Sequence, residues 1–175
     1  IMNYTKEQIE TLSNKLLNIC RNILVNTDGS PNLYYKEGIY QDLLIHELNS
    51  LHYRTIRENV FNYSFKDYAG NTIYIGNNQC LRSDIELPDD SCILELKATS
   101  SEITTENLYQ LRNYLEHRSD LQWGIVINFI SKCTPKCQPK VQFIILYKNL
   151  HNNKYSKKKM CSEPYPEETF TFDEW

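Results

Sequence analysis

Hydrophobic residues along the chain follow two spacings, and each spacing predicts a different kind of secondary structure. Three segments repeat apolar residues every three or four positions, which is typical of helices with one buried face: 5–25, 34–51 and 104–116. Other segments are rich in β-branched and aromatic residues and are bounded by turn-forming residues, which predicts strands. These are 55–65, 72–75, 80–87, 91–98, 123–130 and 141–148. Their order predicts an α/β fold in which helices flank a mixed sheet.

Each predicted helix has one apolar face. In the first helix this face comprises Ile9, Leu12, Leu16, Ile19 and Ile23, and Thr5 followed by Gln8 resembles a capping box. In the second helix the residues expected to face inward are Ile39, Leu43, Leu44, Leu48 and Leu51. In the third helix they are Leu108, Leu111, Tyr114 and Leu115.

The composition suits one folded domain. The chain has 175 residues, of which 41% are hydrophobic and 23% charged, as in an ordinary globular protein with a buried core. We expect a single domain over residues 1–150, with its core at 33–148 and the helix at 5–25 added before it. Residues 151–175 carry a basic run and then an acidic, aromatic end, which predicts a loosely held polar tail. Such a tail also fits an adaptor that recruits a partner.

Charge and targeting signals narrow the class of protein. The net charge of −3 gives no global basic footprint, so contact with nucleic acid has to come from local patches or metal ions. No apolar run approaches the ~20 residues that span a bilayer, and the first residues lack a signal-peptide pattern. We therefore expect no membrane association and an intracellular location, in cytoplasm or nucleus. Abundant Asn, Ile, Lys and Tyr suggest an AT-rich source genome, such as that of a virus or its host.

Six cysteines are present, and reduced thiols are expected in a chain of this kind. Cys133 and Cys137, with Cys161, have some of the spacing of metal ligands. A second close pair that would complete a zinc site is missing, which favours ordinary thiols.

Charged residues around one predicted hairpin form the strongest candidate for chemistry. If Asp89 and Asp90 are the central turn residues, the antiparallel register places Asp84 opposite Glu95 and, further out, Arg82 opposite Lys97. All four side chains then emerge on one face, because side chains alternate along a strand. The opposite face of the second strand is apolar: Cys92, Leu94, Leu96 and Ala98. A turn that includes Pro88 would shift this register by one residue.

Opposed carboxylates need a compensating charge, because like charges facing each other destabilise a sheet. A divalent cation such as Mg²⁺ supplies it, since Mg²⁺ takes one or two carboxylates together with a substrate phosphate. Lys97 points to the same side as Glu95, where it could hold an attacking water and offset phosphate charge. The competing interpretation is a solvent-facing strand whose charges form surface ion pairs.

Five motifs in order resemble those of one nuclease superfamily. They are Tyr34-x-x-Glu37-x-x-Tyr40, Arg82-x-Asp84, Glu95-Leu96-Lys97-Ala98, Gln110-Leu111-x-x-Tyr114-Leu115 and Gly124-x-x-Ile127-Asn128-Phe129. Over residues 33–130 the chain resembles the PD-(D/E)XK nuclease superfamily, and within it the GxxExxY (GxxExxRxD) proteins. The leading glycine of that motif is Tyr34 here, which leaves the placement of Glu37 open.

The resemblance implies a restriction-endonuclease-like αβββαβ core and a Mg²⁺-dependent nuclease, with Mn²⁺ as a substitute and DNA as the expected substrate. It implies that Asp84 and Glu95 bind the metal, with the Leu96 carbonyl as a third ligand, and that Lys97 is catalytic. A catalytically silent nucleic-acid-binding or assembly module on the same fold is the alternative.

The resemblance also implies roles for residues around this centre. Glu37 would approach the metal from the second helix, directly or through water. Gln110 and Tyr114 would orient the site or contact the nucleic-acid backbone. The alternatives are plain helix packing for Tyr114 and a solvated amide for Gln110. Arg82 would contact a phosphate or fix Asp84 through an ion pair.

Overall fold

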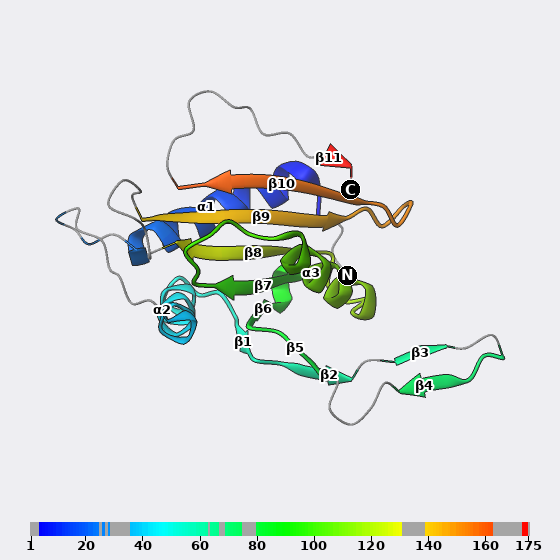
Figure 1. Cartoon of the computed structure of the whole chain (residues 1–175). Coiled ribbons are helices and arrows are strands. Elements are labelled where there is room, and N and C mark those ends of the chain that lie inside the picture. The colour runs from blue at the N-terminus through cyan, green and yellow to red at the C-terminus, as the bar shows by residue number, and fades with distance from the viewer. Residues whose placement is uncertain are drawn as a thin grey trace.

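The hydrophobic segments assemble into a sheet that carries helices on both faces (Figure 1). The computed structural model describes residues 4–24, 26, 28, 36–62, 64–66, 69–74, 80–130, 139–162 and 173–174. Its helices are α1 (Lys6–Leu24), α2 (Glu37–Ser50) and α3 (Thr105–His117), with a short 3₁₀ turn, η1 (Pro88–Asp90). Its strands are β1 (Ile56–Arg57), β2 (Val60–Asn62), β3 (Ser64–Lys66), β4 (Thr72–Tyr74), β5 (Cys80–Arg82), β6 (Ile85–Leu87), β7 (Cys92–Lys97), β8 (Trp123–Ile130), β9 (Lys140–Lys148), β10 (Tyr155–Cys161) and β11 (Asp173–Glu174).

The main sheet is mixed, as predicted. Its seven described strands lie in the order β1-β6-β7-β8-β9-β10-β11. β7 and β8 run parallel, whereas the other neighbouring strands are antiparallel. A parallel pair needs a crossover connection, and α3 provides it between β7 and β8.

Two core clusters lie on opposite faces of this sheet. Leu94 and Leu96 of β7 pack with residues of α1 and α2 on one face. Ile93, which points the other way, packs with Leu111 and Leu115 of α3. Because side chains alternate along a strand, Glu95 and Lys97 share the α3 face with Ile93.

The buried face of α3 agrees with the sequence prediction, and those of α1 and α2 agree in part. In α1 four of the five predicted residues are buried, while Ile19 is only partly buried. In α3 the buried residues are the four predicted, and the Thr5–Gln8 capping bonds form at the start of α1. In α2, Leu44 and Leu48 are buried as expected, but Ile39 is 36% and Leu51 52% exposed. Tyr40 and Gln41 take the inward positions instead, with the Tyr40 ring stacked 4.2 Å from that of Phe129. A large aromatic ring buries more apolar area than Ile39 would, so it sets the rotation of the helix.

The predicted continuous strand over residues 80–87 is wrong. The chain bends at Ser83 and Asp84, so β6 joins the main sheet while β5 pairs with β2 in a separate ribbon. A second ribbon of β3 and β4 continues away from the sheet, and together they form an arm between β1 and β6 (Figure 1).

The expectation of a loosely held tail after residue 150 is also wrong for residues 155–161. These form β10, which pairs with β9 over seven residues and carries β11 on its outer side. Alternation explains how a basic segment can be a strand. Tyr155 packs against the α3 cluster and Met160 against the α1 cluster, while the Lys158 ammonium lies 2.6 Å from the Glu10 carboxylate.

Across the described ranges, none of the helices combines the length and apolar character that a bilayer crossing requires.

Gly124 provides a test of how closely α3 packs on β8. A Cβ atom built on Gly124 would lie 2.7 Å from Leu111 Cδ1 and 2.8 Å from the Ile93 carbonyl oxygen. We expect Gly124→Ala to lower the free energy of unfolding by about 1–3 kcal/mol in urea titrations, because the backbone itself would have to shift. Gly38→Ala in α2 is the control. Its Cβ would meet nothing within 4 Å, so it should be neutral or stabilising by about 0.5–1 kcal/mol. Equal midpoints for wild type and Gly124→Ala would contradict this packing.

Candidate active site

The hairpin formed by β6 and β7 has the register that the sequence predicts. Ser91 adopts a left-handed backbone conformation, with φ of 50°, and donates a hydrogen bond to the Pro88 carbonyl, which closes a turn centred on Asp89 and Asp90. The paired residues that follow are Leu87 with Cys92, Glu86 with Ile93 and Ile85 with Leu94. The ladder ends at the Ile85–Leu94 pair, so Asp84 is the first residue outside it.

Beyond the ladder, two hydrogen bonds from backbone to side chain link Asp84 to Glu95 and to the residue after it. The Asp84 backbone N–H donates to Glu95 Oε1 at 3.2 Å, and the Leu96 backbone N–H donates to Asp84 Oδ2 at 2.7 Å. For the Asp84 N–H, a side-chain acceptor therefore replaces the Glu95 backbone that would have continued the ladder. This arrangement brings the two carboxylates together.

The peptide that follows Asp84 is fixed from two more sides. Its carbonyl oxygen accepts from Gln41 Nε2 of α2 at 2.9 Å and from the Glu58 backbone N–H at 3.1 Å. The predicted opposition of Arg82 and Lys97 does not form, because Arg82 pairs with Val60 at the root of the arm. The Arg82 side chain is exposed there.

Glu95 is a nearly buried carboxyl, with 3% of its surface exposed. Burial, and secondarily the charge of Asp84, raise its pKa from 4.5 to about 9, although the Asp84 N–H bond and Lys97 oppose this shift. Buried charge is costly unless it is paired, so the ionised form of this residue calls for a nearby cation.

Glu37 and Lys97 complete the charged cluster. Glu37 is the first residue of α2, one turn before the Gln41 side chain that holds the Asp84 carbonyl. The protein around its carboxyl raises the pKa of Glu37 by desolvation, and the Asp84 charge adds to this, while Lys97 lowers it. Asp84 and Lys97 thus lie within electrostatic reach of both Glu37 and Glu95, although these groups come from α2, from β7 and from the bend before β6.

Tyr114 and Gln110 of α3 approach from the same face of the sheet. The buried Tyr114 hydroxyl donates to the Arg82 carbonyl at 3.1 Å and accepts from Gln110 Nε2 at 2.9 Å. Burial, followed by the Glu95 charge, raises the pKa of Tyr114. Gln110 is exposed, so in this arrangement it acts on the site through Tyr114.

The donor chemistry of this cluster fits a hard divalent cation. Within the described part of the chain, no three His, Cys, Asp or Glu side chains converge into a ready-made ligand cluster. Mg²⁺ does not require one, because it keeps several waters and commonly binds through one or two carboxylates plus substrate phosphates. Two adjacent carboxylates, one of them almost buried, match this requirement. Cys133 and Cys137, the possible thiol ligands, lie outside the described residues.

Two buried amides beside the site were not anticipated from the sequence. Asn128 of β8 and Gln142 of β9 lie in the row that continues from Lys97 across the sheet. Asn128 accepts from the Thr99 N–H and donates to the Ser101 carbonyl, and Gln142 accepts from the Ile103 N–H. The two amides thus hold the segment between β7 and α3. The sequence does indicate them, because a polar residue within an otherwise apolar strand usually has a buried hydrogen-bond partner.

A second unanticipated feature is a buried ion pair next to Asp84. Glu86 is fully buried and binds Arg118, whose nitrogens lie 2.8 and 3.0 Å from its carboxylate oxygens. An acidic residue between two apolar ones in a buried strand indicates a buried partner, but not which one.

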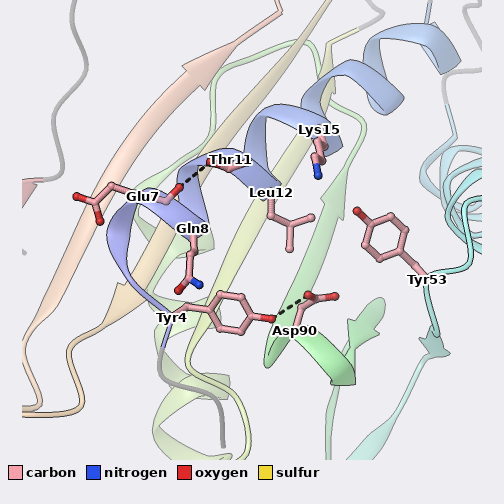
Figure 2. Close-up of a pocket in the computed structure, with 8 residues that line it drawn as sticks. All are labelled: Tyr4, Glu7, Gln8, Thr11, Leu12, Lys15, Tyr53 and Asp90. Carbon is pink, nitrogen blue, oxygen red and sulfur yellow. Dashed lines mark hydrogen bonds between the residues drawn. The ribbon is translucent and has the colours of Figure 1, made fainter.

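An open pocket of about 370 Å³ lies away from these residues, between the start of α1 and the turn η1 (Figure 2). Tyr4 and Tyr53 point into it around Asp90, which accepts a 2.9 Å bond from the Tyr4 hydroxyl. Burial and this bond raise the pKa of Tyr4 to about 12. None of the clustered carboxylates lines the pocket, so it is separate from the candidate site.

Comparison with known proteins identifies the family. A family model for the PD-(D/E)XK nuclease superfamily matches residues 14–142, which is most of the chain. No curated protein matches. The crystal structure of SSO0001 is similar at 18% identity and a TM-score of 0.36, over 61% of this chain and 52% of that one, so this chain spans about half the length of that protein. The assignment rests on the family model, which includes both carboxylates and Lys97: the chain belongs to the PD-(D/E)XK nuclease superfamily.

Proposed function

We propose that this protein is a divalent-metal-dependent nuclease that hydrolyses phosphodiester bonds, with DNA as its substrate. The observation that carries this proposal is that hydrogen bonds hold the Asp84 and Glu95 carboxylates side by side, from the Asp84 N–H to Glu95 and from the Leu96 N–H to Asp84, with Lys97 within electrostatic reach of Glu95. Most members of the superfamily are nucleases, and they typically use divalent metals.

Asp84 and Glu95 are the proposed metal ligands, with the Leu96 carbonyl as a third. Glu37 approaches from α2, either as a ligand or through water. A bound Mg²⁺, or Mn²⁺ in its place, would neutralise charge on the scissile phosphate and favour ionisation of water. Glu95 would then be ionised by the nearby positive charge, despite its burial.

Lys97 is the proposed catalytic lysine. It follows Glu95 by two residues and therefore projects from the same face of β7. Its ammonium group would hold the attacking water beside the phosphate and offset the negative charge that builds up as the phosphorus–oxygen bond breaks.

Gln110, Tyr114 and Arg82 would support the substrate. The exposed Arg82 guanidinium lies at the root of the arm and would contact a backbone phosphate. Tyr114 would fix this segment through the Arg82 carbonyl, and Gln110 would orient Tyr114.

We further infer that the chain is a GxxExxY protein within the superfamily. Four parts of the motif set support this: Glu37, Tyr40, Asp84 and the Glu95–Ala98 segment. The first two lie on α2, and Glu37 there is within electrostatic reach of Asp84. Tyr34, where the motif has glycine, lies outside the described residues. We also propose that the protein acts inside the cell, in cytoplasm or nucleus.

Metal binding and cleavage should separate in single variants. We expect Asp84→Asn and Glu95→Gln to weaken Mn²⁺ binding in calorimetric titrations by more than about 10-fold, because each removes a charged ligand. Lys97→Met should keep Mn²⁺ binding but lower the rate of DNA cleavage by at least about 100-fold. Asp89→Asn, at the exposed far end of the same hairpin, is the matched control and should change neither quantity.

Wild-type protein that binds DNA but cuts neither DNA nor RNA with Mg²⁺ or Mn²⁺ would favour a silent nucleic-acid-binding module. Cleavage of RNA alone would keep the chemistry and overturn the choice of DNA.

The burial of Glu95 also predicts how stability depends on pH without metal. Because its pKa rises from 4.5 to about 9 on folding, its contribution is fully present below pH 4.5 and is lost as pH rises through about 9. In EDTA, Glu95→Gln should therefore gain stability relative to wild type between pH 5 and 9, measured by urea unfolding. Glu106→Gln, at an exposed position of α3, serves as the control. If the difference in unfolding free energy between Glu95→Gln and wild type stayed constant with pH, the burial of Glu95 would be contradicted.

A further inference from the structure

Glu86 and Arg118 form an ion pair that a stable sheet does not require. Glu86 lies in the middle of β6 with no exposed surface, and the Arg118 side chain is 15% exposed. Taking two charges out of water costs as much as their attraction returns, or more, unless the geometry is excellent. Here it is: two guanidinium nitrogens meet the two carboxylate oxygens, and Ser83 Oγ donates to Glu86 Oε2 at 2.7 Å.

The Arg118 guanidinium is itself held in place by Asp120. Arg118 Nε and Nη2 donate to the two Asp120 oxygens at 2.9 and 2.8 Å. Hydrogen bonding to Arg118 lowers the pKa of Asp120, and the bonds to both carboxylates raise the pKa of Arg118. A planar fork bound on two sides has one orientation, which suits a rigid support.

Arg118 is the residue that directly follows α3, where the backbone has left the helix for an extended conformation. Tyr114 of α3 bonds the Arg82 carbonyl, and Arg118 bonds Glu86. The segment around Asp84 is therefore attached on one side to α3 and on the other to the residue that ends it.

Ser83 links this support to Asp84 directly. Its hydroxyl joins Glu86, and its backbone N–H donates to the Asn59 carbonyl at 3.1 Å. The bend that presents the Asp84 carboxylate to the Leu96 N–H is thus defined on one side by Glu86 and on the other by the root of the arm.

We propose that Glu86 and Arg118 are positioning residues that hold Asp84 in its geometry for the metal. The pair fixes Glu86 and, through it, the Ser83 hydroxyl on the other side of Asp84, so the Asp84 carboxylate stays on the Leu96 N–H and beside Glu95. This inference rests on the proposed metal-dependent function, and it extends the site to two residues that touch neither metal nor substrate.

A paired substitution separates positioning from stability. Glu86→Gln leaves Arg118 without its buried counter-charge, so it should destabilise the fold. The double variant Glu86→Leu/Arg118→Met replaces both charges with apolar groups of similar size, a change that is often neutral or stabilising. If the pair only stabilised the protein, recovery of stability would restore metal binding as well.

Two measurements should be made on the metal-binding wild type and these variants. We expect the double variant to bind Mn²⁺ about 10-fold or more weakly, as for other residues that orient a metal ligand. We also expect its Leu96 amide to exchange with deuterium faster in metal-free protein, because that N–H bonds Asp84 Oδ2. Both changes should persist at urea-unfolding stability equal to that of wild type.

The matched control is a second ion pair remote from the site, Lys158 with Glu10. Lys158→Met/Glu10→Gln removes an ion pair whose lysine is also buried, and it should leave Mn²⁺ affinity and Leu96 exchange unchanged. Wild-type affinity and exchange in the Glu86/Arg118 double variant would overturn the positioning role while leaving the nuclease proposal intact. If the wild type bound no Mn²⁺, the nuclease proposal would fail, and unchanged Leu96 exchange would independently reject positioning of Asp84.

Discussion

Much of this structure depends on the hydrogen bond from the Asp84 N–H to the Glu95 carboxylate. Asp84 is the next register partner of Glu95, but its N–H bonds the Glu95 side chain instead of the Glu95 backbone, and the β6–β7 ladder ends at Ile85 and Leu94. The Asp84 carboxylate in turn accepts from the Leu96 N–H, so it lies beside Glu95. The geometry that ends the sheet is therefore the geometry that creates the candidate site.

Electrostatic cost explains why so many other residues converge on this point. Two carboxylates beside each other, one of them nearly buried, are unfavourable until a cation joins them. The chain supplies part of this charge through Lys97, which lowers the pKa of both Glu95 and Glu37. It supplies rigidity through Gln41, Tyr114 and the Glu86–Arg118 pair, which contact the backbone or the neighbours of Asp84. A divalent cation would provide the remaining positive charge, which is the physical basis of the proposed function.

The sequence predicted the parts of the structure that depend on local spacing. The buried faces of α1 and α3 follow from the three- and four-residue periods, and the β6–β7 register follows from the turn at Asp89 and Asp90. The bend at Asp84 could not be predicted, because it depends on bonds from the Asp84 backbone to Glu95, Gln41 and Glu58, which lie at different distances along the chain. The partner of Glu86 could not be identified either, since Arg118 is 32 residues away along the chain. Residues 155–161 look polar in the sequence, and they form a strand because they pair with β9.

The central claim is that Asp84 and Glu95 together bind a divalent metal ion. A crystal of the protein soaked in Mn²⁺ and measured for anomalous scattering tests this most directly. We predict a single anomalous peak between the two carboxylates, lost in Asp84→Asn and retained in Lys97→Met. Well-ordered carboxylates with no peak between them at saturating Mn²⁺ would contradict the account.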